Sequence, residues 1–431
     1  MTPKADSSWK FPAAFWTANV VELFERAAYY AVFIAITLYL TQVVGFNDIW
    51  AAWISGFFSA GLYFLPPFSG AFADKIGFRN SIILAFSLLT VGYFTLGLLP
   101  YKVIVIPALI VLMFGGSFIK SIITGTVAKT SNNINRARAY SIFYGIVNVG
   151  AFTGKTVAYP LRINLGLESI NYYAATMTLI ALVLVLFFYR NVETAQKRTF
   201  SEVWASFIKV ATNGKLLVLI LIVSGFWIIQ QQLYATMPKY VLRMVGKNAS
   251  PEWIANVNPF VVMVFVVIIT NFMSKVKAIN SMIIGMFLMP LSALAMFLSS
   301  FVAGNTVGNI SFFGIFSLHP ITVMLIVGVA IQGVAESFIS PRYLEYFSKQ
   351  APKGQEGLYL GFSHLHSFIS SILGFGISGY LLTEYCPDPK YLTETQKITA
   401  YSHAHYIWIY FLAIGVTSGI ALFIYSKINR E

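Results

Sequence analysis

The stretch Glu22-Leu23-Phe24-Glu25-Arg26-Ala27-Ala28-Tyr29-Tyr30 places three charges and two phenols inside an apolar run that extends from about Phe11 to Leu40. At about 100° per residue, the charged and phenolic side chains fall within roughly 140° of arc on one helix face. The run is long enough to span a bilayer, where a charge costs on the order of 2.5 kcal/mol or more. These three charges must therefore face protein or water.

The composition places the whole chain in a membrane. Its 431 residues are 57% hydrophobic and only 10% charged, too few charges to cover a soluble globule of this size. The net charge of +13 is scattered through loops without stacking platforms, so we expect no nucleic-acid partner. The single cysteine, Cys386, excludes an intramolecular disulfide and a thiol metal site. A cleaved signal peptide is not expected either.

Apolar runs of about 20 residues or more predict about twelve membrane helices. Their approximate ranges are 12–43, 50–73, 80–99, 103–130, 138–163, 170–189, 214–244, 252–273, 279–301, 320–349, 356–383 and 402–426.

The distribution of basic residues predicts the orientation. With the N-terminus inside, eighteen Lys and Arg fall in cytoplasmic segments, seven fall outside and four lie within spans. This bias predicts a multi-pass plasma membrane protein with both termini in the cytoplasm. The short N-terminus and single cysteine suit a bacterial inner membrane.

One long polar connection divides the chain. We expect an N-terminal six-helix bundle at 1–190, a cytoplasmic linker at 191–213 and a C-terminal six-helix bundle at 214–431. Within the linker, residues 200–209 place Phe200, Trp204, Phe207 and Ile208 on one side. An amphipathic helix lying in the membrane interface would show this pattern. A plain linker is the alternative.

After the second predicted span comes Gly70-Ala71-Phe72-Ala73-Asp74-Lys75-Ile76-Gly77-Phe78-Arg79. An acid beside two bases in a short cytoplasmic loop can lock neighbouring helix ends together. This loop resembles the signature between the second and third helices of the major facilitator superfamily. The resemblance implies an all-α membrane fold of 12 transmembrane helices in two six-helix bundles. The corresponding loop of the second half, 274–277, has no acid.

Seven ionisable residues lie deep in predicted spans, too many to be incidental. Pairing of acids with bases across a shared cavity would explain these residues. The alternative is that they form structural ion pairs alone. They are Glu22, Glu25, Glu336, Arg26, Lys120, Lys155 and Arg342.

The first stretch, as Glu-x-x-Glu-Arg-x-x-Tyr-Tyr, resembles the ExxER signature of proton-coupled oligopeptide transporters, a branch of the same superfamily. Five further places agree in register: Tyr63, the segments 115–120 and 143–152, Trp227, and the segment 336–341. The resemblance implies that Glu22, Glu25, Arg26 and Lys120 couple protons. It also implies a substrate site made by Tyr29, Tyr30, Tyr63, Asn148, Trp227 and Glu336. We add Lys155, Gln231 and Arg342 to this candidate site as residues particular to this chain.

Two positions depart from that family. A gating arginine of the first helix is replaced by Phe33, and its acidic partner of the seventh helix by Gln231. Loss of both partners avoids a stranded charge, but it puts coupling through this pair in doubt. Lys155 and Arg342 look like additions, and a surplus of basic residues favours an anionic group in the substrate. Lys155 could instead be structural.

The sequence thus predicts a secondary transporter, not an enzyme, that carries di- and tripeptides with protons by alternating access. Substrate would enter a cavity between the two halves, and protonation of Glu22 or Glu25 would release Lys120 or Arg26. A carrier of another small organic anion is the first alternative, and a transporter-like receptor or channel is a remote one. We expect a monomer in the lipid bilayer, with protons as the coupling ion and no cofactor or catalytic residue. The histidine pairs 364/366 and 403/405 lack a third ligand, so no metal is expected.

Overall fold

The computed structural model describes residues 11–131, 135–190, 199–306, 308–312, 314–350 and 362–429. The chain divides into two compact units, each described by itself. Unit 1 comprises Met1–Phe33 and Gly61–Phe207, and unit 2 comprises Ile34–Ala60 and Ile208–Glu431. The helices α1 (Ala13–Gln42) and α2 (Asp48–Phe64) each contribute residues to both units. The predicted three-part division of the chain stays a prediction.

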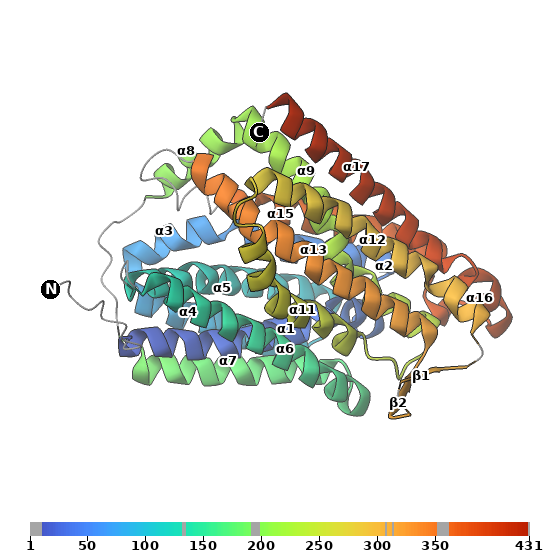
Figure 1. The fold of residues 1–431 in the computed structure, drawn as a ribbon. Coiled ribbons are helices and arrows are strands. Elements are labelled where there is room, and N and C mark those ends of the chain that lie inside the picture. The colour runs from blue at the N-terminus through green and yellow to red at the C-terminus, as the bar shows by residue number, and fades with distance from the viewer. Residues whose placement is uncertain are drawn as a thin grey trace. The chain divides into compact units, whose positions relative to one another are not determined.

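The helices that complete unit 1 are α3 (Pro66–Ile76), α4 (Phe78–Leu98), α5 (Lys102–Lys129), α6 (Arg136–Leu165), α7 (Glu168–Phe188) and the start of α8 (Phe200–Ala211). In Figure 1, α4, α5 and α7 run side by side, and α4 packs against both of the others. A hydrogen bond of 3.1 Å between the hydroxyls of Thr90 and Thr178 joins α4 to α7.

Unit 2 contains α9 (Gly214–Ala235), α10 (Met237–Met244), α11 (Pro251–Phe272), α12 (Ala278–Asn305), α13 (Pro320–Gln350), α15 (Leu365–Tyr385), α16 (Glu394–Tyr401) and α17 (Ile407–Ile428). α13 packs on α11 and α12, and α9 packs on α15 and α17. An antiparallel hairpin of β1 (Ile310–Phe312) and β2 (Phe316–Leu318), paired Ile310 to Leu318, connects α12 to α13.

The prediction of an all-α membrane fold is confirmed. In the described part of the chain, ten helices are long and apolar enough to cross a bilayer, and the bent pair α2 and α3 raises this number to 11. α6 is 30 residues long and carries several basic residues, so it is more polar than the ten helices counted above. Twelve membrane helices are consistent with this arrangement. The predicted span 356–383 lies partly outside the described residues.

Two predicted spans are broken by proline. The range 50–73 consists of α2 and α3, which meet at an angle of 51°, and the range 214–244 is divided at Thr236 between α9 and α10. Pro66 and Pro238 each stand in the first turn of the second helix. Proline is accepted in a first turn because the N–H it lacks has no helical partner there.

The loop that carried the family resemblance does tie helix ends together. Gly77 adopts φ of 88° between α3 and α4, a left-handed conformation that favours glycine. Arg79 then donates hydrogen bonds to the carbonyls of Leu186 and Tyr189 at the end of α7, at 2.9 and 3.1 Å. A guanidinium at the C-terminus of a helix satisfies its last carbonyls and its dipole.

The predicted amphipathic helix in the linker is present as α8. Its aromatic face packs in unit 1: the ring centroids of Phe200 and Phe68 are 5.1 Å apart, and those of Phe207 and Phe64 are 5.6 Å apart. Trp204 remains 46% exposed. The helix therefore covers the junction of α2 and α3 while keeping apolar surface on its outside, as expected in a membrane interface.

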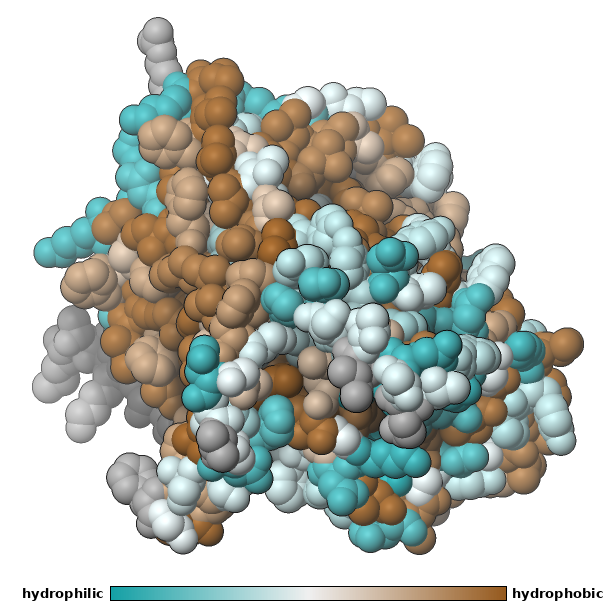
Figure 2. Space-filling view, turned by 90° about the vertical axis from the view of Figure 1, so that its right-hand side faces the viewer, coloured by the Kyte–Doolittle hydropathy of each residue, from teal (hydrophilic) through white to brown (hydrophobic). Residues whose placement is uncertain are grey.

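Large apolar side chains cover much of the surface of both units. Val91, Val103 and Phe187 of unit 1 and Phe272 of unit 2 are all at least 62% exposed. Figure 2, seen from the side on which α16 lies in Figure 1, shows hydrophilic side chains gathered in one area with hydrophobic side chains bordering them. Apolar surface of this extent indicates contact with lipid.

Candidate functional site

An ion cluster is buried on α1 in unit 1. Arg26 Nε lies 3.1 Å from Oε1 of Glu22, and a second guanidinium nitrogen contacts Glu25. The three residues are 3% (Glu22), 2% (Glu25) and 6% (Arg26) exposed. Oε2 of Glu22 has no hydrogen-bond partner among the described residues. A buried group of two acids and one base is costly unless further charge or protons complete it.

Lys120 on α5 is the nearby cation. It lies close enough to interact electrostatically with Glu22 and Glu25, but within the described part of the chain it makes no ion pair. Its ammonium lies 3.8 Å from the ring centroid of Tyr63 on α2, a cation–π contact. The sequence predicted that Lys120 pairs directly with Glu22 and Glu25. In this structure Arg26 makes the ion pairs with both acids instead.

Glycines on α6 allow that helix to touch α1 beside the cluster. A Cβ atom at Gly150 would lie 2.7 Å from Cβ of Arg26, and one at Gly154 would lie 2.2 Å from the carbonyl oxygen of Ala27. Such distances leave room only for hydrogen, so glycine permits the close approach. Next to them Lys155 is 1% exposed, and its ammonium lies 5.6 Å from the ring centroid of Tyr30.

Aromatic residues continue the α1 face beyond Arg26. The Arg26 guanidinium carbon lies 5.3 Å from the ring centroid of Tyr29, and Tyr29 stacks on Phe33 at 5.1 Å. Phe33, where the family would have a charge, thus serves as packing for Tyr29. Asn148 on α6 is half-buried and donates a hydrogen bond of 2.9 Å to the carbonyl of Tyr144.

In unit 2 the acid Glu336 on α13 lies among amides. Its Oε2 accepts hydrogen bonds from Gln230 on α9 at 3.2 Å and from Asn258 on α11 at 3.3 Å. Neither amide was singled out from the sequence, although Gln230 adjoins Gln231. The signal that the sequence offered for both amides was a polar side chain within an apolar span.

The remaining predicted residues of unit 2 have separate surroundings. Trp227 packs on His366, with ring centroids 5.1 Å apart. Gln231 donates a hydrogen bond of 3.0 Å to the hydroxyl of Ser371 on α15, so it joins two helices. Arg342 pairs with Glu345 at 2.7 Å and donates to the carbonyl of Met273 at the end of α11. Arg342 therefore has the partners of a structural residue.

A second buried ion cluster was missed. Lys239 and Arg243 on α10 both contact Asp48 at the start of α2, with nitrogen–oxygen distances of 2.7 and 2.9 Å. Both bases lie near the end of the predicted span 214–244, and the sequence analysis assigned them no partner. Their spacing of four residues, one helical turn, was the signal for a shared partner.

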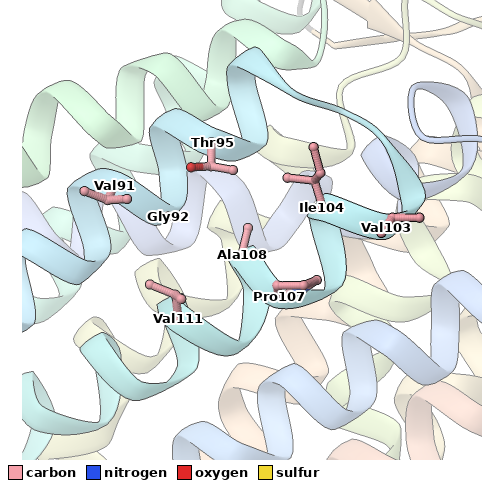
Figure 3. Close-up of a pocket in the computed structure, with 8 residues that line it drawn as sticks. All are labelled: Val91, Gly92, Thr95, Val103, Ile104, Pro107, Ala108 and Val111. Carbon is pink, nitrogen blue, oxygen red and sulfur yellow. The ribbon is translucent and has the colours of Figure 1, made fainter.

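No metal centre is found in the described residues. They hold no group of three side chains placed to bind a metal ion. A hollow of about 290 Å³ lies between α4 and α5 in unit 1 (Figure 3). Thr95 supplies the only side-chain polar atom among the residues that line it: Val91, Gly92, Thr95, Val103, Ile104, Pro107, Ala108 and Val111. Exposed Val91 and Val103 mark it as lipid-facing surface.

Curated proteins of two kinds are similar to this chain. Multidrug resistance protein MdtH of Blochmanniella floridana is 21% identical over 371 residues, which cover 83% of this chain and 84% of that protein. Dipeptide and tripeptide permease B of Photorhabdus asymbiotica is 29% identical over 184 residues, which cover 42% of this chain and 37% of the permease.

Solved structures share the fold over nearly the whole chain. The crystal structure of a POT family transporter in complex with 5-aminolevulinic acid has a TM-score of 0.76 at 17% identity, covering 96% of this chain and 95% of that one. The in meso crystal structure of the POT family transporter PepTSo has a TM-score of 0.75 at 17% identity, covering 98% and 99%.

The family itself follows from the match of residues 19–315 to the family model described as Major Facilitator Superfamily, which is more than half of the chain. The chain belongs to the major facilitator superfamily, a family of multi-pass membrane transporters of small molecules and not of enzymes.

Proposed function

We propose that this protein is a symporter that carries di- and tripeptides together with protons by alternating access. The observation that carries the proposal is the buried cluster of Glu22, Glu25 and Arg26 on α1. The fold shared with POT family transporters and the partial similarity to dipeptide and tripeptide permease B support the same reading.

In this proposal the coupling ion is a proton on Glu22 or Glu25. Together with Lys120 the cluster holds two acids and two bases. Protonation of one acid removes a partner of Arg26, which leaves a buried positive charge in need of an anion. The carboxylate of a peptide supplies that anion through a charge-assisted hydrogen bond. Proton binding and substrate binding thereby favour the same state, which is the requirement for symport.

The substrate's other contacts are assigned as follows. In unit 1, Arg26, Lys120 and Lys155 attract the carboxyl end, with Tyr29, Tyr30, Tyr63 and Asn148 around it. In unit 2, Glu336 accepts the amino group beside Trp227, and the amides of Gln230 and Asn258 hold the Glu336 carboxylate in place. Arg342 is not included among the substrate contacts because its guanidinium already pairs with Glu345 and donates a hydrogen bond to the carbonyl of Met273.

A second candidate is a carrier of another small organic anion. It is favoured by Lys120, which in the described structure has an aromatic ring and no carboxylate within ion-pair distance. We further propose that the protein acts as a monomer without a cofactor, in a bacterial inner membrane with both termini in the cytoplasm. The excess of basic residues in the assigned cytoplasmic segments supports this orientation.

The experiment is transport by purified Glu22→Gln and Glu25→Gln proteins in proteoliposomes. Each glutamine keeps the shape of the acid but cannot exchange a proton. We expect accumulation of a labelled dipeptide driven by an inward proton gradient to fall by more than tenfold, while exchange of labelled for unlabelled dipeptide continues. Full gradient-driven accumulation in both variants would contradict the assignment of the proton site.

A further inference from the structure

The cluster of Asp48, Lys239 and Arg243 has no part in the function proposed above. Asp48 is 5% exposed and Lys239 is 2% exposed, and the Arg243 side chain is 7% exposed. Oδ1 of Asp48 accepts from Lys239 at 2.7 Å and from Arg243 at 3.0 Å, and Oδ2 lies 2.9 Å from Arg243. The single carboxylate of Asp48 therefore binds two basic side chains that lie one helical turn apart on α10.

The cluster continues into the connection after α15. Arg243 also donates a hydrogen bond to the carbonyl of Cys386, and Asp388 lies 4.0 Å from the same guanidinium. Lys390 lies 3.7 Å from Asp388 at the exposed margin. The charges thus join the start of α2, the end of α10 and the connection that follows α15.

The rest of α2 packs on α15 within unit 2 through small and neutral residues. The hydroxyls of Ser59 and Ser371 are 2.9 Å apart. A Cβ atom at Gly376 would lie 2.8 Å from the Trp53 ring, and one at Gly379 would lie 2.8 Å from Cβ of Ala52. This contact is closely packed, but neutral contacts of this kind can separate without stranding a charge.

We propose that Asp48, with Lys239 and Arg243, forms the latch that holds the outer end of α2 closed against α10 and opens in each transport cycle. The inference rests on transport by alternating access, but not on the substrate. The latch also differs from the family's gate, whose two charged positions are Phe33 and Gln231 here. In that gate the base lies on the first helix and the acid on the seventh, whereas in the latch the acid lies on α2 and the bases lie on α10. Because one buried acid serves two bases, removing Asp48 leaves Lys239 without its carboxylate and Arg243 with only the more distant Asp388, which favours separation.

The chain supplies its own reporter for this opening. Cys386 is its single cysteine, is 0% exposed, and lies directly beside the latch through the hydrogen bond from Arg243 to its carbonyl. Opening of the latch would expose its thiol to water on one side of the membrane. Labelling by a membrane-impermeant maleimide therefore measures the open fraction without any substrate.

The test compares labelling rates of reconstituted wild-type, Asp48→Asn, Asp48→Lys and Asp48→Lys/Lys239→Asp proteins. We expect Asp48→Asn and Asp48→Lys to be labelled at least tenfold faster than wild type from the outer face, and the double variant, which again has one acid between two bases, to return to within about threefold of wild type. Lys390→Gln, at the exposed margin, is the matched control and should label like wild type.

Three results would overturn the latch. The first is an Asp48→Asn protein that is labelled at the same rate as wild type. The second is a double variant that is labelled as fast as Asp48→Lys. Equal labelling of Asp48→Asn from both membrane faces would also do so, since it indicates local unfolding. Cys386→Ala establishes the background. If labelling behaves as expected while dipeptides are not carried, the latch stands and the substrate proposal fails.

Discussion

The ammonium of Lys120 lies 3.8 Å from the ring centroid of Tyr63, and this contact joins α5 to α2 in unit 1. The tyrosine thereby fixes the position of the base that, in our proposal, attracts the substrate's carboxylate. A cation over an aromatic face keeps its full charge for an incoming anion, whereas a salt bridge would have neutralised it.

We predict that Lys120→Ala and Tyr63→Ala both raise the KM for dipeptides by about tenfold or more. A fold change of ten corresponds to about 1.4 kcal/mol, which lies within the range of cation–π contacts that are shielded from water. Tyr63→Phe should stay within about twofold of wild type because the ring remains. Initial rates in proteoliposomes give the values. A defect in Tyr63→Phe as large as that in Tyr63→Ala would mean that the hydroxyl, and not the ring, matters.

The contact between α6 and α1 yields a stability prediction. Gly154→Ala should lower the free energy of unfolding by about 1–3 kcal/mol, since its methyl group would lie 2.2 Å from the Ala27 carbonyl. Gly145→Ala on the same helix is the control because, apart from its chain neighbours and its own helix backbone, no described atom lies within 4 Å of its Cβ position. Thermal unfolding in detergent compares the two. Equal melting temperatures would show that the two helices do not pack as described.

The different surroundings of two charged residues on α13 predict different defects. Glu336→Gln should raise the KM for dipeptides with a free amino group by about tenfold, and should change uptake of the N-acetylated dipeptide little. Arg342→Gln should leave both KM values unchanged and lower stability by about 1–3 kcal/mol, because it loses the Glu345 pair and the bond to the Met273 carbonyl. If Arg342→Gln instead altered KM for both peptides with wild-type stability, Arg342 would bind substrate.

The sequence predicted the membrane fold well because length and apolarity of a helix are local properties. It missed the breaks at Leu65 and Thr236, since a proline in a hydrophobic run is compatible either with one kinked helix or with two helices. The two proline-led helices, α3 and α10, could not be distinguished from continuations by composition alone.

Partners of charged residues were predicted less well, for a physical reason. Glu22, Glu25 and Arg26 are neighbours on one helix, so the sequence already places them together. Lys239 and Arg243 are close to each other in sequence, but their shared partner, Asp48, lies about 190 residues earlier. Such a contact depends on how helices pack, and one sequence carries no record of it.

The most direct test of the central claim is uptake by the wild-type protein in proteoliposomes, with and without an inward proton gradient. The panel contains di- and tripeptides, dicarboxylates, sugar phosphates and nitrate. We predict that di- and tripeptides accumulate above their outside concentration only when the gradient is present. Accumulation of an anion from the panel with no uptake of any peptide, or peptide accumulation that ignores the gradient, would contradict proton-coupled peptide transport.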